Sequence, residues 1–228
     1  MSALVRGNKV LSPHDPLVDA SWKFRETYAS KTGGLMDWPY INTDWALGYI
    51  DRGEPDRCTQ LFYTFLSLGS GTLDWGEWYQ LNKTFSEFDP PIVAAEADSE
   101  MPHTESCATF ILLVRSMMLR ELDGDLHIAV AAPRKWLAPG EHYGVENAPS
   151  HFGRVDYRIS MDSDGRTVRA TVGIQGDRNP SRLLVHFRTP GDHGLSKATV
   201  NGKPTDGFLG DCVIVPSPVS STTIEAEL

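Results

Sequence analysis

Hydrophobic residues follow two different patterns along the chain, and the pattern changes near residue 123. Before this point apolar residues recur every three or four positions, which is typical of helices that pack on helices. After it they alternate with polar residues in short runs, as in strands with one buried face. We expect helices over residues 17–28, 43–53, 55–66 and 106–122. We expect strands over residues 126–131, 155–160, 168–174, 183–187, 198–200 and 212–215.

The ends of these elements add to the prediction. Pro55 lies where the first turn of a helix accepts proline, so residues 43–66 are expected to form an αα-hairpin. The helix over residues 106–122 is too apolar for a solvated face and is expected to be buried on more than one side. Asp-Gly and Asn-Gly turns separate the strands, which indicates an antiparallel sandwich or barrel. The predicted fold is α+β, with a helical domain over residues 1–122 and a β-sandwich over residues 123–228.

Composition and charge narrow the range of partners. The 228 residues carry a formal net charge of −9 without a dense run of Lys or Arg, so nucleic acid and anionic membranes are not expected as partners. No apolar stretch approaches the length that spans a bilayer, and the first residues lack the apolar stretch of a signal peptide. The chain as given is therefore expected to be cytoplasmic. Its three widely spaced cysteines fit neither a disulfide framework nor a zinc site.

The most informative stretch is residues 69–79, GSGTLDWGEWY, which follows a predicted helix and is expected to form a non-helical loop. It combines the carboxylates of Asp74 and Glu77 with the indoles of Trp75 and Trp78. Pyranose rings stack their apolar faces on tryptophan, and carboxylates bind sugar hydroxyls or exchange protons with the glycosidic oxygen or an attacking water. This combination of side chains indicates a carbohydrate site.

Two further loops repeat the combination of acidic and aromatic side chains. The residues concerned are Asp37, Trp38, Tyr40 and Asn42 in residues 33–45, and His103 and Glu105 in residues 100–106. Each loop borders a predicted helix, so we expect the three loops to converge at one end of a helical barrel. Each residue also has a simpler explanation, because tryptophans beside loops usually pack and first-turn carboxylates favour the helix dipole. The three loops together favour a shared site over separate caps.

Several segments occur in an order that carries a family resemblance. They are NTDWALGYIDRGEP at residues 42–55, LFYTFL at 61–66, DWGE at 74–77, MPHTESCATFI at 101–111, LHIA at 126–129, PRKWLAPG at 133–140 and VNGK at 200–203. In this order they resemble the C-terminal portion of six-hairpin, (α/α)6-barrel glycosidases, in particular α-L-rhamnosidases of glycoside hydrolase family 78 and related bacterial proteins. The resemblance covers most of the chain. It implies a partial (α/α) helical-hairpin barrel followed by a C-terminal antiparallel β-sandwich.

The resemblance also implies roles for the loop residues. Glu77 would be the general base that activates water in an inverting hydrolysis. Asp74 is the alternative, because the family has Trp-Glu where this chain has Trp-Gly-Glu. The residues that bind the sugar would be Asp37, Trp38, Tyr40, Asn42, Trp75, Trp78, His103 and Glu105. The carboxylates of an inverting pair lie about 6.5–9.5 Å apart, so the general acid must come from another loop.

A complete barrel of this kind has about twelve helices, whereas residues 1–122 have room for four or five at ordinary helix lengths. The general acid of such enzymes usually lies in the earlier hairpins. The chain is therefore expected to be a fragment, a truncated reading frame or one half of a split enzyme. Its expected function is that of the C-terminal part of a glycoside hydrolase acting on a plant or bacterial glycan. It is expected to be inactive alone and to associate with the missing N-terminal barrel half or with itself.

The residues leave two other functions open. The chain could be a non-catalytic carbohydrate-binding or accessory module, or a structural protein without a ligand. No Gly-x-Gly-x-x-Gly follows a predicted strand and no phosphate loop occurs, so no cofactor is expected. The histidines lack metal-ligand spacing, so no metal is expected either. Carbohydrate is the expected partner of an enzyme and of a binding module alike.

Overall fold

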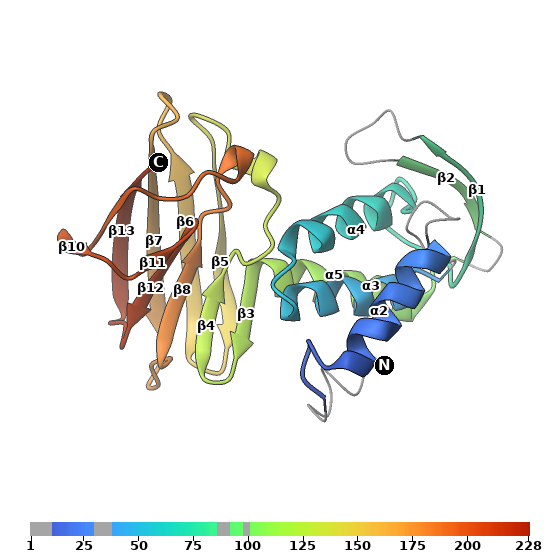
Figure 1. Ribbon diagram of the computed structural model, residues 1–228, viewed down its shortest axis with the longest axis horizontal. Helices are drawn as coiled ribbons and strands as arrows, with labels where there is room; N and C mark the ends of the chain where they lie inside the picture. The colour runs from blue at the N-terminus through green and yellow to red at the C-terminus, as the bar shows by residue number, and fades with distance from the viewer. Residues whose placement is uncertain (1–10, 30–37, 86–91, 98–100) are drawn as a thin grey trace. The chain divides into compact units, whose positions relative to one another are not determined.

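The computed structural model of the chain describes residues 11–29, 38–85, 92–97 and 101–228. The chain divides into two compact units, the helical unit (residues 1–116) and the β-unit (residues 117–228). Four helices among the described residues precede two sheets, one of them antiparallel and one mixed (Figure 1). The predicted α+β class is confirmed at this level.

The helical unit contains the four helices and a small sheet. The helices are α2 (Pro16–Ala29), α3 (Pro39–Asp51), α4 (Pro55–Ser67) and α5 (Thr104–Met118), the last of which runs two residues into the β-unit. Strands β1 (Tyr79–Phe85) and β2 (Ile92–Ala97) form an antiparallel pair. A short turn joins α3 to α4, in which Gly53 has a positive φ of 73° and Pro55 occupies the first helical turn, as expected.

Helix α2 packs on α3 through aromatic side chains. The rings of Trp22 and Trp45 meet edge to face with 4.5 Å between centroids. Gly48 makes room for this packing, because a Cβ at that position would lie 2.5 Å from the Trp22 ring. The buried guanidinium of Arg25 lies over the rings of Trp45 and Tyr49, at 5.4 and 5.8 Å. The interface between these helices therefore combines close ring packing with cation–π contacts.

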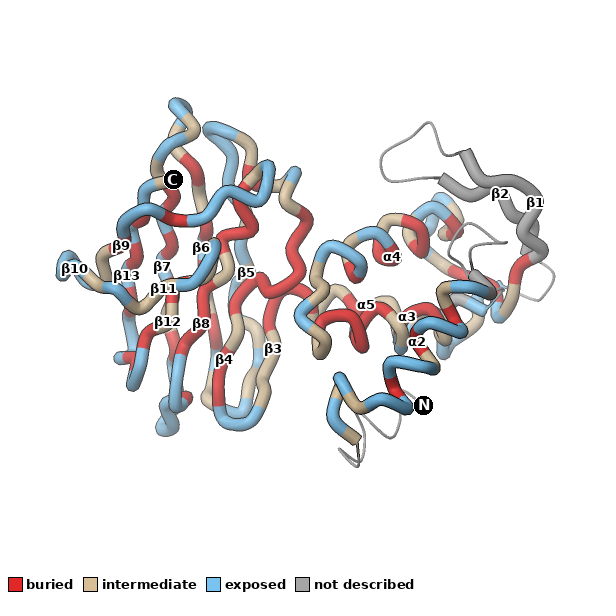
Figure 2. The backbone as a smooth tube through the Cα atoms, in the orientation of Figure 1, coloured by how far each residue is buried: buried red, intermediate tan, exposed pale blue. Residues whose placement is uncertain are grey.

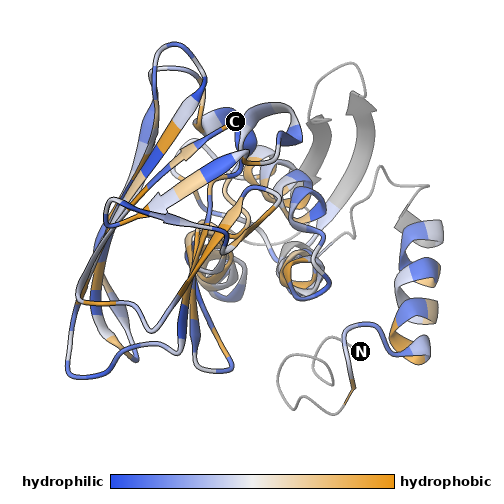
Figure 3. Cartoon of the chain, turned by 60° about the vertical axis from the view of Figure 1, so that its left-hand side comes forward, coloured by the Kyte–Doolittle hydropathy of each residue, from blue (hydrophilic) through white to orange (hydrophobic). Residues whose placement is uncertain are grey.

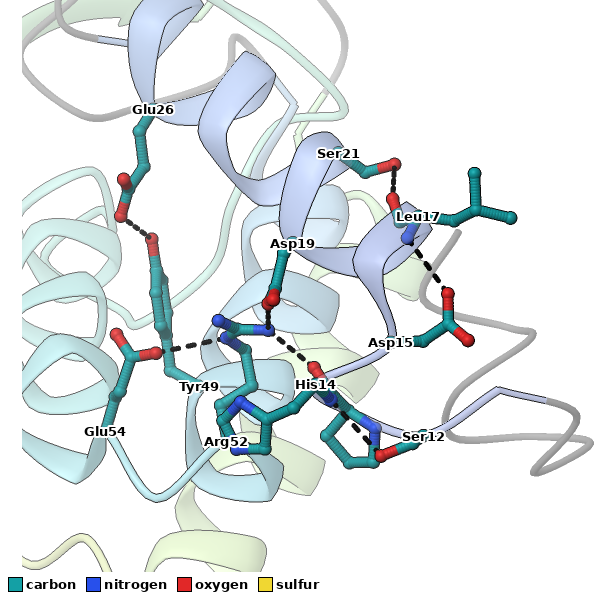
Figure 4. A network of polar contacts seen from close by, with 11 residues as sticks. Ser12, His14, Asp15, Leu17, Asp19, Ser21, Glu26, Tyr49, Arg52 and Glu54 are labelled. Atoms are coloured by element: carbon teal, nitrogen blue, oxygen red, sulfur yellow. Dashed lines mark hydrogen bonds and ion pairs between the residues drawn. The ribbon is translucent and has the colours of Figure 1, made fainter.

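A polar network secures the same interface (Figure 4). Arg52 follows α3 directly, and its side chain is 12% exposed. Its guanidinium donates to Oδ1 of Asp19 over 2.8 Å and to Oε1 of Glu54 over 3.0 Å. The Tyr49 hydroxyl donates to Oε1 of Glu26 over 3.3 Å. These bonds connect α2 with α3 and with the turn into α4, which fixes the relative positions of the three helices.

The β-unit consists of two sheets that face one another (Figure 3). In spatial order the first sheet contains β10 (Lys203–Thr205), β9 (Lys197–Val200), β13 (Ser221–Glu227), β7 (Thr167–Gln175), β6 (Gly153–Met161) and β5 (His142–Ser150). The second contains β11 (Phe208–Leu209), β12 (Cys212–Pro216), β8 (Arg182–His186), β4 (Asp125–Ile128) and β3 (Leu119–Leu122). Short 3-10 helices span Arg134–Trp136 and Pro190–Asp192.

Buried residues alternate along the strands of the β-unit (Figure 2). In the neighbouring strands β6 and β7 the buried positions are Val155, Tyr157, Ile159 and Met161, and Val168, Ala170, Val172 and Ile174. The two strands pair antiparallel with Ile159 opposite Ala170, so their buried residues share one face. The period-two pattern in the sequence therefore predicted these strands and their inner face correctly.

The expected helix over residues 106–122 ends early, at Met118. Residues 119–122 form β3 and pair with β4 across a tight turn, in which Asp123 and Gly124 both have positive φ. The apolar run continues without a break from α5 into Leu119, so spacing alone could not separate the helix from the strand. Residues 119–122 therefore belong to the β-unit and not to the helical domain to which the sequence pattern assigned them.

Three further expectations are corrected. Helix α3 begins at Pro39 rather than at residue 43, because proline fits the first turn of a helix, so Tyr40 and Asn42 are helical and not loop residues. Strands β1 and β2 were not predicted from the pattern. Strand β4 pairs with β8 in parallel, which makes the second sheet mixed rather than antiparallel. The described helices do not form a closed barrel.

Candidate functional site

Trp75 anchors the loop that follows α4. Its indole is 2% exposed and packs against the rings of Phe65 and Phe110, at 5.2 and 4.4 Å between centroids. Its Nε1 donates a 2.9 Å hydrogen bond to the carbonyl of Phe65. At Gly69 a Cβ would approach the indole to 3.0 Å, so glycine makes room for it. The indole has no exposed face on which a sugar could stack, so Trp75 is a packing residue and not the expected sugar platform.

Hydrogen bonds fix the peptide unit between Trp75 and Gly76, shortly before Glu77. The amide of His103 donates to the carbonyl of Trp75 over 2.7 Å. The amide of Gly76 donates to the hydroxyl of the buried Tyr79 over 2.9 Å, and that hydroxyl donates to a carbonyl just after α4. The start of the Glu77 loop is thus held from the end of α4 and from the start of α5.

Asp74 closes the turn at the beginning of this loop. Its carboxylate accepts hydrogen bonds from the hydroxyls of Ser70 and Thr72, the second over 3.0 Å. These bonds, first that of Ser70, lower the pKa of Asp74 because they stabilise its ionised form. A carboxylate with both oxygens engaged and a lowered pKa is a weaker base, so Asp74 is a poorer candidate for a general base than Glu77.

Aromatic rings from the other two predicted loops meet at Tyr40, in the first turn of α3. The Trp38 ring stacks on Tyr40 with 6.0 Å between centroids and 19° between planes. The centroid of the His103 ring lies 5.8 Å from that of Tyr40. Trp38 is 45% exposed, so its indole can be reached from solvent. Residues about sixty positions apart in the sequence therefore share one cluster of rings.

Two exposed carboxylates complete this cluster. Glu77 and Glu105 both raise the pKa of Tyr40, in addition to the larger effect of burial. A nearby carboxylate raises the pKa of a phenol because it disfavours the negative phenolate. Both carboxylates therefore act electrostatically on the Tyr40 phenol, and residues from all three predicted loops are linked through it. We call this group the Tyr40 cluster; it consists of Trp38, Tyr40, Glu77, His103 and Glu105.

Of the other predicted site residues, the structure describes Asn42 and Trp78. Asn42 is buried in α3, and its Nδ2 donates to the carbonyl of Trp38 over 3.3 Å, which helps to hold the segment before the helix. Trp78 is half-buried next to Glu77 in the loop. Asp37 lies outside the described residues. Asn42 thus supports the cluster through the backbone rather than offering its amide to a ligand.

Ser106 was not singled out from the sequence, although it joins two parts of the site. It is fully buried, and its Oγ lies 3.0 Å from the carbonyl of Gly76 and 2.9 Å from Nδ1 of His103. The spacing His-x-x-Ser at the start of a helix was the available signal. The residue before a helix and the third residue within it are the positions that exchange hydrogen bonds in a helix cap.

No group of three or more His, Cys, Asp or Glu side chains in the described ranges is arranged to hold a metal ion. Over the same ranges, no helix combines the length and the apolar character needed to cross a membrane.

Comparisons with known proteins give no further guide to this site. No protein-family model matches the sequence, and no curated protein matches it either. The Tyr40 cluster itself is therefore the basis for inferring a function.

Proposed function

We propose that this chain is the C-terminal part of a glycoside hydrolase of the six-hairpin type, resembling α-L-rhamnosidases, and that the Tyr40 cluster is its sugar subsite. In this proposal α2 to α5 are hairpin helices of an (α/α) barrel, and the two sheets of the β-unit are its terminal β-sandwich. The observation that carries the proposal is the meeting of rings and carboxylates at Tyr40. Exposed carboxylates beside an accessible indole are the groups that a pyranose ring requires.

Glu77 is the general base of the proposed inverting reaction. It is exposed to water and lies shortly after the Trp75–Gly76 peptide unit, which hydrogen bonds hold in place. Asp74 is engaged by two hydroxyls, which favours Glu77 for this role. Trp38 replaces Trp75 as the platform on which the sugar stacks, because only the Trp38 indole is exposed.

The enzyme requires helices beyond those described here. A six-hairpin barrel has twelve helices, and the described residues of the helical unit provide four. Leu17 and Phe24 on α2 and Ile111 and Leu112 on α5 are exposed, which gives both helices apolar surface that further hairpins could cover. The general acid would come from those hairpins, in another chain or in a longer form of this one.

Sugar binding by the chain is the first test of this function. Tryptophan fluorescence is recorded while L-rhamnose, D-glucose and D-galactose are added in turn. We expect a saturable change with one of them, and we expect Trp38→Ala to remove binding. Phe24→Ala is the matched control, because this exposed ring lies on α2 outside the cluster and its removal should leave binding intact.

Glu77→Gln then separates an enzyme from a binding module. Turnover of an aryl glycoside of the bound sugar, measured with the completing helices supplied, should fall by about 10²–10⁴-fold, while sugar binding persists. Unchanged turnover would remove Glu77 from its proposed role. Binding without any turnover would favour the accessory module, and a folded chain that binds no sugar would contradict the subsite itself.

A further inference from the structure

A single buried hydroxyl connects the His103 ring with the peptide unit that leads into Glu77. The Ser106 Oγ lies 2.9 Å from Nδ1 of His103 and 3.0 Å from the carbonyl oxygen of Gly76, and both distances are those of hydrogen bonds. Gly76 directly precedes Glu77. The side chain of Ser106 is excluded from solvent, so water cannot replace either bond.

The hydroxyl has one proton, so it can donate fully to only one of these two neighbours at a time. When the His103 ring is neutral, Nδ1 is the better acceptor. The backbone amide of Ser106 also points at Nδ1, over 3.3 Å, and the partial positive charge of a helix N-terminus favours an unprotonated nitrogen there. The hydroxyl then donates to Nδ1, and the ring proton lies on Nε2.

Protonation of the ring reverses this arrangement. Both ring nitrogens of an imidazolium are donors, so Nδ1–H now donates to the Ser106 Oγ. The hydroxyl becomes an acceptor and turns its own proton to the Gly76 carbonyl, which lies within reach at 3.0 Å. The His103 ring keeps a partner at Nδ1 in both states, and the Gly76 carbonyl gains a hydrogen bond only when the ring is charged.

We propose that Ser106 is a positioning residue that holds the His103 ring through a change of protonation and transmits that change to the peptide unit before Glu77. The relevance of this switch to sugar chemistry rests on the function proposed above. There, it would keep Nε2 of His103 aimed at the site while the backbone of Glu77 responds to the ring. The switch itself depends only on the contacts of Ser106.

A test must distinguish the titration of the His103 ring from that of other titratable groups in the same region. They are Tyr40 on α3, Asp74 and Glu77 in the loop after α4, and Glu105 and Cys107 on α5. Carboxyls, thiols and phenols ordinarily titrate about two or more pH units away from imidazole. A response that follows the His103 ring can therefore be distinguished from theirs.

The test is an NMR titration of the full chain without sugar. The ring nitrogens of His103 and the backbone amide of Glu77 are followed together, because a hydrogen bond to the Gly76 carbonyl shifts the resonance of the next amide. We expect the Glu77 amide to move over the same pH interval as the His103 ring, and we expect unprotonated Nδ1 in the neutral ring. Ser106→Ala should abolish this movement of the amide, and Ser106→Thr, which retains a hydroxyl, should restore it.

Two further variants keep the result decisive. Thr109→Ala removes a hydroxyl of the same helix that binds only the Ser106 carbonyl, over 3.1 Å, and should leave the movement unchanged. His103→Asn keeps a side chain suited to a helix cap but cannot titrate, so the movement should disappear even if Ser106→Ala fails to fold. A Glu77 amide that ignores the His103 ring in the wild type, or that follows it equally in Ser106→Ala, would overturn the proposal. A chain that binds no sugar but shows the coupling would contradict only the proposed function.

Discussion

The two units of this chain differ in how many of their large apolar side chains are exposed to solvent. Among the described residues of the β-unit, the exposed large apolar side chains are Leu209 and Val219. In the helical unit they are Leu17, Phe24, Trp38, Leu73, Met101, Ile111 and Leu112. The β-unit therefore exposes few of its large apolar side chains, whereas the helical unit presents many of them to solvent.

The reason lies in the number of apolar faces that each element carries. A strand such as β6 has one apolar face, and pairing with a facing sheet satisfies it completely. Helix α2 buries Val18, Trp22 and Arg25 on one side and exposes Leu17 and Phe24 on another. A helix with apolar residues on two sides belongs to a larger helical assembly more naturally than to an isolated unit. This contrast supports the proposal that the helical unit is one part of a barrel.

The largest expected effect distinguishes two tryptophans of the helical unit. Trp75→Ala should destabilise this unit by about 3–5 kcal/mol, because it leaves a cavity beside the rings of Phe65 and Phe110. Trp38→Ala removes a ring that is 45% exposed and should cost less than about 1 kcal/mol. Urea unfolding followed by fluorescence and by near-UV circular dichroism measures both. Similar losses for the two variants would contradict the division of roles between them.

A second, smaller change in stability is expected to have the opposite sign to the one that helix propensity predicts. Gly48→Ala ordinarily stabilises a helix by roughly 1 kcal/mol. In α3 the new Cβ would lie 2.5 Å from the Trp22 ring, so the variant should instead destabilise the helical unit by about 1–3 kcal/mol. Thermal unfolding checks the sign. A stabilised Gly48→Ala protein would show that α2 does not pack on α3 at this point.

The third prediction concerns the pH dependence of the β-unit. Burial, aided by the charges of His127 and Arg188, lowers the pKa of His186 to about 3. An unfolded histidine has a pKa of about 6.5, so below that pH the unfolded chain binds more protons than the folded one. The stabilising contribution of neutral His186 is complete above about pH 6.5 and is lost as the pH falls toward 3.

His186→Gln removes this titration and should flatten the decline of β-unit stability between pH 6.5 and 4, as measured by denaturant midpoints at each pH. His142→Gln is the control, because His142 is exposed on β5 and should leave the decline unchanged. An equal decline in the His186→Gln protein would show that another group governs the acid sensitivity.

The sequence predicted which segments are helices and which are strands better than it predicted where each of them begins and ends. Alternation in residues 155–160 and 168–174 is unambiguous, and the strands lie there. The end of α5 was missed because an apolar run serves a buried helix and a buried strand equally well. Residues 17–28 were expected to form a helix that packs on other helices through its apolar residues. Leu17 and Phe24 are exposed, however, and the buried face of α2 includes Arg25, whose charge is accommodated by aromatic rings that no local pattern reveals.

The candidate site was predictable in composition but not in the roles of its members. Aromatic and acidic loops pointed to Tyr40, Glu77 and His103, and the rings of Tyr40 and His103 lie 5.8 Å apart. The sequence could not tell a buried Trp75 from an exposed Trp38, because that difference depends on which rings of α4 and α5 face the loop. Ser106 was not recognised from the sequence, because its two hydrogen-bond partners, His103 and Gly76, come from different segments of the chain.

The proposed site requires three loops to meet at Tyr40. A titration of the Tyr40 phenol followed by ¹³C NMR tests whether they do. We expect the pKa of Tyr40 to lie above the ordinary value of about 10. We expect this pKa to be lower in Glu77→Gln and in Glu105→Gln than in the wild type. Glu26→Gln, next to Tyr49, is the control and should leave Tyr40 unchanged. A Tyr40 that titrates at its ordinary value, and that responds to neither substitution, would show that the loops do not form one site.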